Sequence, residues 1–143
     1  MIVINLAIVI LSFFNAPELA QNVEVRVTGI RNNKGFIVIS VFKDQSTFAK
    51  ERPFFTKNFD KKEMQNNMLL AKFHLEEGHY GFALLDDENN NAQMEYSFLG
   101  IPEEGFGFSD YYHTGFTRPK FESFKLEITK QVLHKSTIKI RYM

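Results

Sequence analysis

The fold is decided by the segment Val23-Glu24-Val25-Arg26-Val27, in which valine alternates with charged residues. Successive side chains of a β-strand point to opposite faces of the sheet, so this pattern predicts a strand with one buried and one solvated face. The following apolar segment, residues 35–42, lacks this alternation and predicts a strand in the middle of a sheet. Asparagine, lysine and glycine between the two segments predict a turn.

Other segments with strand character follow along the chain. They are a weaker one at residues 54–59, a pair at 69–75 and 80–84, and two near the end at 124–128 and 138–142. The pair is joined by a Glu-Glu-Gly turn signal and predicts a β-hairpin, whereas residues 44–53 predict a loop with one short helical turn. About seven strands without a sustained helical period predict an all-β domain. Its expected form is an antiparallel β-sandwich of immunoglobulin-like or transthyretin-like type.

The composition narrows the classes of function. The chain has sixteen Phe, five Tyr, no Trp and no Cys, so we expect a core rich in phenylalanine. The absence of cysteine excludes thiol catalysis and zinc–thiolate sites. Seventeen basic and seventeen acidic residues give a formal net charge of zero. Because nucleic-acid binding depends on concentrated lysine and arginine, we expect no nucleic-acid partner.

The N-terminal residues carry the information about location. Residues 2–14 form an apolar run broken only by Asn5 and Ser12, which is short for a membrane span and typical of the hydrophobic region of a signal peptide. Ala20 is a small residue suited to cleavage. We therefore predict a signal peptide at residues 1–20 and one β-sandwich domain at 21–143. The mature chain is expected to be exported to the periplasm or the medium, with no membrane span. The alternative is an N-terminal core strand.

Residues 86–120 show no sustained period and contain four glycines and two prolines. Long loops in compact domains are uncommon and are often functional. We expect Gly105 and Gly107 to permit sharp bends, and most phenylalanines between Tyr96 and Phe124 to close one end of the core. Tyr111 and Tyr112 are the candidates for exposed aromatic rings that stack on a sugar or a protein partner.

One polar segment has the spacing of a calcium loop. Asp87, Asn89, Asn91 and Glu95 fall at relative positions 1, 3, 5 and 9, with the carbonyl of Gln93 available at position 7. Calcium takes roughly six to eight oxygen ligands, and alternating Asp and Asn side chains can direct several oxygens at one ion. The alternative interpretation is that these side chains cap a solvated turn through their own backbone.

The calcium pattern is incomplete. An EF-hand loop has glycine at position 6 and a bidentate glutamate at position 12, whereas this chain has Ala92 and Phe98 there. Only Asp87 carries a full charge among the first three ligand positions. Calcium is therefore a candidate cofactor for which the sequence predicts weak affinity.

Two further groups have residue types used in hydrolysis. They are the acidic residues at 86–88, 103–104 and 110, and the set Ser109, Asp110 and His113. Paired carboxylates can cleave glycosidic bonds only at a defined separation, which spacing in sequence does not supply, so a solvated acidic rim is the favoured interpretation. No Gly-x-Ser-x-Gly elbow accompanies the serine, and this disfavours a catalytic triad.

Four segments also carry a resemblance to a known family. They are Val27-Thr28-Gly29-Ile30-Arg31-Asn32, Leu85-Asp86-Asp87-Glu88-Asn89-Asn90-Asn91, Phe98-Leu99-Gly100-Ile101-Pro102-Glu103-Glu104-Gly105-Phe106-Gly107-Phe108-Ser109 and Pro119-Lys120-Phe121-Glu122. Over residues 22–142 the chain resembles the bacterial domain-of-unknown-function 2141 family. The resemblance implies an exported β-sandwich with no assigned activity. The chain departs from the family at Asp86, where histidine is usual, and at Ala92, where glycine is usual.

These observations lead to one functional hypothesis and two alternatives. We predict an exported, non-enzymatic binding or structural module with an unknown protein or glycan partner, contacted through residues 86–120. The first alternative is a calcium-stabilised carbohydrate-recognition domain that uses Tyr111 and Tyr112. A hydrolase that uses the acidic residues is the least supported.

Overall fold

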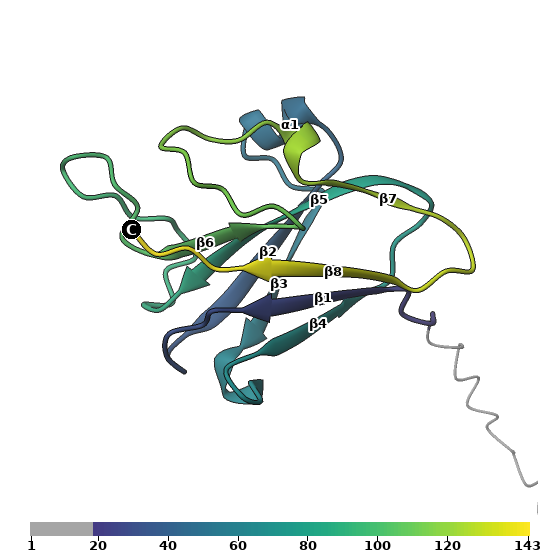
Figure 1. Ribbon diagram of the computed structural model, residues 1–143, viewed down its shortest axis with the longest axis horizontal. Helices are drawn as coiled ribbons and strands as arrows, with labels where there is room; N and C mark the ends of the chain where they lie inside the picture. The colour runs from purple at the N-terminus through teal and green to yellow at the C-terminus, as the bar shows by residue number, and fades with distance from the viewer. Residues whose placement is uncertain (1–18) are drawn as a thin grey trace, which may run out of the picture.

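The computed structural model describes residues 19–143, which form two β-sheets packed face to face (Figure 1). The three-stranded sheet has the order β4-β1-β8, with β1 at Val23–Thr28, β4 at Leu69–Phe73 and β8 at His134–Lys139. The five-stranded sheet contains β2 (Phe36–Phe42), β3 (Phe55–Asp60), β5 (Gly78–Asp87), β6 (Gly105–Phe108) and β7 (Lys125–Ile128). The predicted all-β sandwich is therefore confirmed.

Short helical elements connect some of these strands. They are α1 at Gln45–Ala49 and two 3-10 turns, η1 at Lys61–Glu63 and η2 at Phe121–Ser123. Asp44 caps α1, since its carboxylate accepts a hydrogen bond from the backbone N–H of Thr47 at 2.8 Å. None of the helices in the described part of the chain is long and apolar enough to cross a membrane. The apolar run at 2–14 that predicts a signal peptide lies outside the described residues.

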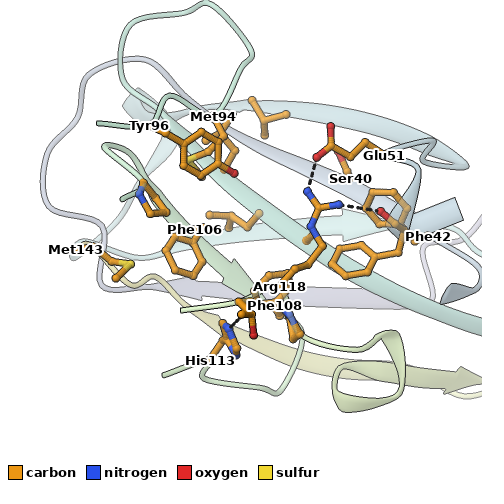
Figure 2. A pocket seen from close by; sticks show the side chains of 18 of the residues that line it. Ser40, Phe42, Glu51, Met94, Tyr96, Phe106, Phe108, His113, Arg118 and Met143 are labelled. Carbon is orange, nitrogen blue, oxygen red and sulfur yellow. Dashed lines mark hydrogen bonds and ion pairs between the residues drawn. The ribbon is translucent and has the colours of Figure 1, made fainter. Parts of the chain in front are cut away.

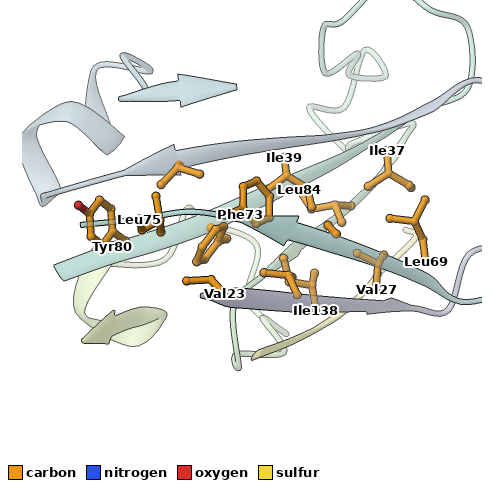
Figure 3. Close-up of a cluster of buried hydrophobic side chains, with 14 of the residues drawn as sticks. Val23, Val27, Ile37, Ile39, Leu69, Phe73, Leu75, Tyr80, Leu84 and Ile138 are labelled. Atoms are coloured by element: carbon orange, nitrogen blue, oxygen red, sulfur yellow. The ribbon is translucent and has the colours of Figure 1, made fainter. Parts of the chain in front are cut away.

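The core lies between the two sheets and follows the two-residue period of the sequence (Figure 3). Val23, Val25 and Val27 of β1 are fully buried, while Arg26 between them is exposed. On the facing sheet, residues from β2 and β5 complete the core, among them Ile37, Ile39, Val41, Tyr80, Phe82 and Leu84. Alternation in the sequence thus places one face of each sheet in a shared apolar layer.

Two predictions about strand pairing are wrong. The sandwich is not wholly antiparallel, because β1 and β8 pair in parallel, with Val23 opposite His134 and Val27 opposite Ile138. In addition, β4 and β5 do not form a hairpin, because they belong to different sheets. The side chain of Asn22 bonds both the N–H and the carbonyl of Leu75, at 2.9 and 2.8 Å. This holds the end of the β4 segment beside β1, and the chain crosses to the other sheet before Gly78.

The segment at residues 105–108 is a strand, not a pair of bends. A Cβ atom on Gly105 would lie 2.4 Å from the ring of Tyr142, and one on Gly107 would lie 2.5 Å from the side chain of Ile138. These glycines are therefore needed for close packing of β6 against the C-terminal segment. Glycine is depleted in strands, and four residues are too few for a sustained alternation, so the sequence pattern favoured bends.

A second apolar cluster lies on the outer face of the five-stranded sheet, beneath α1 and η2. Its buried members are Phe42, Phe48, Phe108, Phe121 and Phe124. Phe48 and Phe124 meet edge to face, with ring centroids 4.9 Å apart. The expectation that most phenylalanines between Tyr96 and Phe124 are core residues is confirmed for Phe108, Phe121 and Phe124. It is wrong for Phe98 and Phe116, which are 97% and 90% exposed.

The packing of the central layer can be tested with one substitution. Phe82 is fully buried in β5 and contacts Phe73 of the opposite sheet at a centroid distance of 5.2 Å. Phe82→Ala should lower the free energy of unfolding by about 3–5 kcal/mol, because it removes buried apolar surface and leaves a cavity. Urea denaturation measures this loss. Phe98→Ala is the matched control and should change the value by less than about 0.5 kcal/mol. Equal effects of the two variants would contradict the observed core.

Candidate functional site

The loop that follows β5 gathers the four residues predicted to bind calcium. Asp87 is 2% exposed, and its two carboxylate oxygens accept hydrogen bonds from the backbone N–H groups of Asn91 (3.1 Å) and Ala92 (2.9 Å). The side-chain amides of Asn89 and Asn91 both donate to the carboxylate of Glu95, at 2.7 and 2.9 Å. The chain therefore curls around these polar side chains as one hydrogen-bonded unit.

The amide oxygens of the two asparagines cap the same loop. Oδ1 of Asn89 accepts from the N–H of Asn91 at 3.1 Å, and Oδ1 of Asn91 accepts from the N–H of Gln93 at 3.0 Å. These are the bonds expected of the capped turn. Within residues 19–143, no group of three or more His, Cys, Asp or Glu side chains is arranged to hold a metal ion. The calcium assignment stays a prediction at this point.

Ala92 occupies the position where a calcium loop has glycine. Its φ of 56° lies in the left-handed region, which alanine adopts only at a cost in conformational energy. The loop thus keeps the backbone shape of a glycine-containing loop although the glycine is replaced. The two hydrogen bonds to the Asp87 carboxylate hold this backbone conformation in place.

Glu104 is a member of this region that the sequence did not reveal. The pairing of Asp86 with Gly105 in the β5–β6 register brings Glu104 opposite Asp87 across the two strand ends. Glu104 is only 5% exposed, and neither of its carboxylate oxygens has a hydrogen-bond partner. Burial raises the pKa of Glu104, and the neighbouring carboxylate of Asp87 raises it further. The backbone N–H of Glu88 points toward the carboxylate and partly offsets this rise in pKa, although it lies outside hydrogen-bond geometry.

A second buried charge in β5 is fully compensated. Lys61 and Asp86 are both completely buried, with Nζ 2.5 Å from Oδ1. Nζ also donates to Oδ1 of Asn32 at 3.0 Å. The other oxygen of Asp86 accepts from the hydroxyl of Tyr142 at 2.5 Å, and that hydroxyl accepts from the N–H of Arg31 at 3.1 Å. Burial and the bond to Asp86 raise the pKa of Tyr142.

These contacts tie three segments of the chain together. The guanidinium of Arg31 makes two bonds to the carboxylate of Glu88, at 2.6 and 3.0 Å, and lies 4.4 Å from the ring centre of Tyr142. The β1–β2 turn, the start of the polar loop and the C-terminal segment are joined at this point. Asp86, Asp87 and Glu104 are buried, so the interpretation of these residues as part of a solvated acidic rim is wrong.

A groove of about 870 Å³ lies over the outer face of the five-stranded sheet (Figure 2). Its floor is a row across four strands, because the register places Thr56 beside Ser40, Ser40 beside Ala83, and Ala83 beside Phe108. The small side chains in the middle of this row leave the space that larger side chains would fill. The sequence contains this signal, but it is visible only once the strand register is known.

The walls of the groove come from the long loop, on both sides of β6. Met94, Tyr96, Leu99 and Ile101 line it from the segment before β6, and Phe116 lines it from the segment after. Tyr96, Leu99 and Phe116 are more than half exposed at its rim, at 56%, 69% and 90%. A concave, mostly apolar surface of this kind is typical of ligand sites.

The charged groups of the groove are paired within the protein. Arg118 makes an ion pair with Glu51 and also donates to the carbonyl of Phe48 at 3.4 Å. Nε2 of His113 contacts the carbonyl of Thr117 at 2.5 Å, as Figure 2 shows near the lower edge of the groove. Arg141 donates to the carbonyls of His113 and Gly115 and so fixes the backbone of this wall.

The two tyrosines predicted to bind a ligand lie outside the lining of this groove. Tyr111 is half-buried against the outer phenylalanine cluster, and its hydroxyl is 3.3 Å from Nδ1 of His113. Tyr112 is 48% exposed, with the ammonium of Lys139 5.2 Å from its ring centre. Their role in glycan binding stays a prediction.

The residue types of a hydrolytic triad are each bonded elsewhere. The hydroxyl of Ser109 is buried, donates to the carbonyl of Phe124 at 2.6 Å, and accepts from the N–H of Phe82 at 3.0 Å. The carboxylate of Asp110 accepts from the N–H of Thr137 at 2.8 Å. Both side chains therefore serve to join the loop to neighbouring strands.

Comparison with known families assigns the chain to one of them. A family model described as an uncharacterized protein conserved in bacteria (DUF2141) matches residues 25–136. This chain belongs to the DUF2141 family. The match begins in β1 and ends in β8, so it includes the polar loop, Glu104 and the groove of this DUF2141 protein. Comparison with curated proteins and with solved structures found no match.

The buried ion pair yields a stability prediction. Lys61→Met should lower the free energy of unfolding by about 3–5 kcal/mol, since it leaves the carboxylate of Asp86 buried without its cation. The double variant Lys61→Met/Asp86→Leu should recover most of this loss, because no uncompensated charge remains. Denaturant unfolding of the two single variants and the double variant measures the coupling. A double variant whose loss equals the sum of the single losses would contradict the interaction.

Proposed function

We propose that this DUF2141 protein is an exported, non-enzymatic module that binds an apolar or amphipathic small molecule in the groove over the five-stranded sheet. The observation that carries the proposal is the apolar groove of about 870 Å³ with small residues at the middle of its floor. Ligand pockets in proteins typically enclose about 300–1,000 Å³. The groove is thus large enough for a molecule of drug or lipid-chain size.

The chemistry of the lining favours a ligand with little charge. Arg118 is neutralised by Glu51, and the remaining polar groups, such as Ser40 and Thr56, bond to each other at 3.0 Å. Methionine and aromatic side chains on the walls adapt to varied apolar shapes. A glycan ligand held by Tyr111 and Tyr112 would lie outside this lining, so we place the ligand in the groove.

A binding role, rather than catalysis, is supported by where the unusual titratable groups lie. Catalytic groups are commonly found in a cleft with a shifted pKa. Glu104 and Tyr142, whose pKa values are raised, are not part of the groove lining. Ser109 and Asp110 are bonded to backbone groups of neighbouring strands. These contacts give Ser109 and Asp110 a structural role outside the groove lining.

A substitution that fills the groove tests the proposal. Ser40→Phe places a large ring at the centre of the floor and should weaken binding of the neutral apolar dye N-phenyl-1-naphthylamine by at least about ten-fold. Dye fluorescence gives the Kd, and circular dichroism with thermal melting verifies that the variant is folded. Thr137→Phe, at an exposed position of β8, is the matched control and should bind like the unmodified protein. Undiminished dye binding by folded Ser40→Phe would overturn the proposal.

Export supplies a separate prediction. The apolar run at residues 2–14 and the small residue Ala20 support cleavage of a signal peptide. In a bacterial host that exports the chain, intact-mass spectrometry of the periplasmic fraction should give a mature protein that begins at Gln21. Retention of the uncleaved chain in the cytoplasm would contradict export.

A further inference from the structure

We propose that the carboxylates of Asp87 and Glu104, together with oxygens of the loop at residues 89–93, bind one Ca²⁺ ion. Glu104 supplies the bidentate carboxylate that the loop itself lacks, because it comes from the strand beside the loop and not from within it. The proposal stands on the geometry of this corner, by which we mean the end of the β5–β6 pair together with the loop at residues 89–95. It does not depend on the ligand of the groove.

The first argument is the position of the two carboxylates. Residues that face each other across antiparallel strands have Cβ atoms about 4.5–5.5 Å apart and point to the same face, and like charges in such positions repel. Asp87 and Glu104 hold these positions at the end of the β5–β6 pair, and both are more than nine-tenths buried. Successive residues of a strand point to opposite faces of the sheet. The ammonium of Lys61, which binds Asp86, therefore lies on the other face and does not neutralise Asp87 or Glu104.

The second argument is the lack of compensation at Glu104. Both carboxylate oxygens are buried without a hydrogen-bond partner. The charged groups that raise its pKa are all carboxylates, namely Asp87, Glu95 and Asp86. A buried charge without a partner is strongly unfavourable, so this side chain needs either a proton or a cation. The surrounding oxygens favour the cation.

The third argument is the set of oxygens around the pair. Each oxygen of Asp87 accepts only one hydrogen bond, and so do the amide oxygens of Asn89 and Asn91, which leaves each able to coordinate an ion. The spacing adds the carbonyl of Gln93 at position 7. Glu95 stands at position 9, which in calcium loops often coordinates through water.

The loop also has the backbone form that such a site requires. The residue at position 6, Ala92, adopts the left-handed conformation for which EF-hand loops use glycine. Position 12 is Phe98, which is 97% exposed and cannot contribute a ligand. Glu103 precedes Glu104, the residue proposed to replace the position-12 ligand. The N–H of Glu103 donates to the carbonyl of Glu95 at 2.9 Å, which holds the segment before β6 against the loop. Neutral amide oxygens in an irregular arrangement suit Ca²⁺ better than Mg²⁺, which requires near-octahedral geometry.

An ion at this corner would act on the groove, a consequence that rests on the proposed function. The segment between Glu95 and Glu104 carries the wall residues Tyr96, Leu99 and Ile101. Both ends of this segment would be held by the same ion. Calcium should therefore order this wall and strengthen dye binding in the groove.

The test is a calcium titration of the chelator-treated protein, without any groove ligand. Isothermal calorimetry should give one site per chain. The melting temperature should rise by about 5–10 °C at a calcium concentration 100 times Kd. Glu104→Gln should abolish both effects, whereas Glu103→Gln, the exposed neighbour, should retain them. Asn91→Ala should weaken the calcium affinity by at least about ten-fold.

A measurement without calcium separates loss of the site from loss of the fold. Calcium-free Glu104→Gln should melt at or above the temperature of the unmodified protein, because the repulsion with Asp87 is removed. If the unmodified protein binds no Ca²⁺ at about 5 mM, or if Glu104→Gln binds it as well as Glu103→Gln does, the proposal is overturned and a proton alone relieves the pair. Dye binding without calcium would persist in that case, so failure of the calcium site would leave the groove proposal standing.

Discussion

The alternation of side chains along β5 is the constraint on which the rest of this structure depends. Its even-numbered residues, from Tyr80 to Asp86, point into the layer between the sheets, where the first three are apolar core residues. Its odd-numbered residues, from Gly81 to Asp87, face outward toward the groove and the polar loop. One strand therefore sets both the core and the candidate binding surface, and a shift of register by one residue would exchange them.

The two acidic residues at the end of β5, Asp86 and Asp87, are buried on opposite faces of the sheet and differ in their partners. The inward one, Asp86, is neutralised by Lys61 and bonded by Tyr142, and together they join distant segments of the chain. The outward one, Asp87, bonds only to backbone N–H groups and stands beside the unpartnered Glu104. Because desolvation of a charge is costly, removal of either partner of the compensated pair is expected to destabilise the fold, whereas the uncompensated pair is the basis of our proposal of a bound cation.

The groove and the polar loop adjoin each other on the outer face of the five-stranded sheet. The row of small side chains through Ser40 and Ala83 forms the floor of the groove, and the polar loop lies at the end of the same face. Ala92 belongs to both, since it lines the groove and its N–H bonds to Asp87. Under our proposal, a cation bound at the carboxylates would therefore also order the wall of the groove.

The layer structure could be predicted from the sequence, because the alternation in residues such as Val23, Val25 and Val27 reflects a local rule of strand geometry. The polar loop from Asp87 to Glu95 could also be identified from the sequence, because the hydrogen bonds that Asp87, Asn89 and Asn91 make within it are local. The sequence did not indicate the parallel β1–β8 pairing, the strand at Gly105–Phe108, or the roles of Lys61 and Glu104, since each of these depends on which segments become neighbours. These features became visible only in the folded chain, because contacts between residues far apart in the chain leave no periodic trace in the sequence.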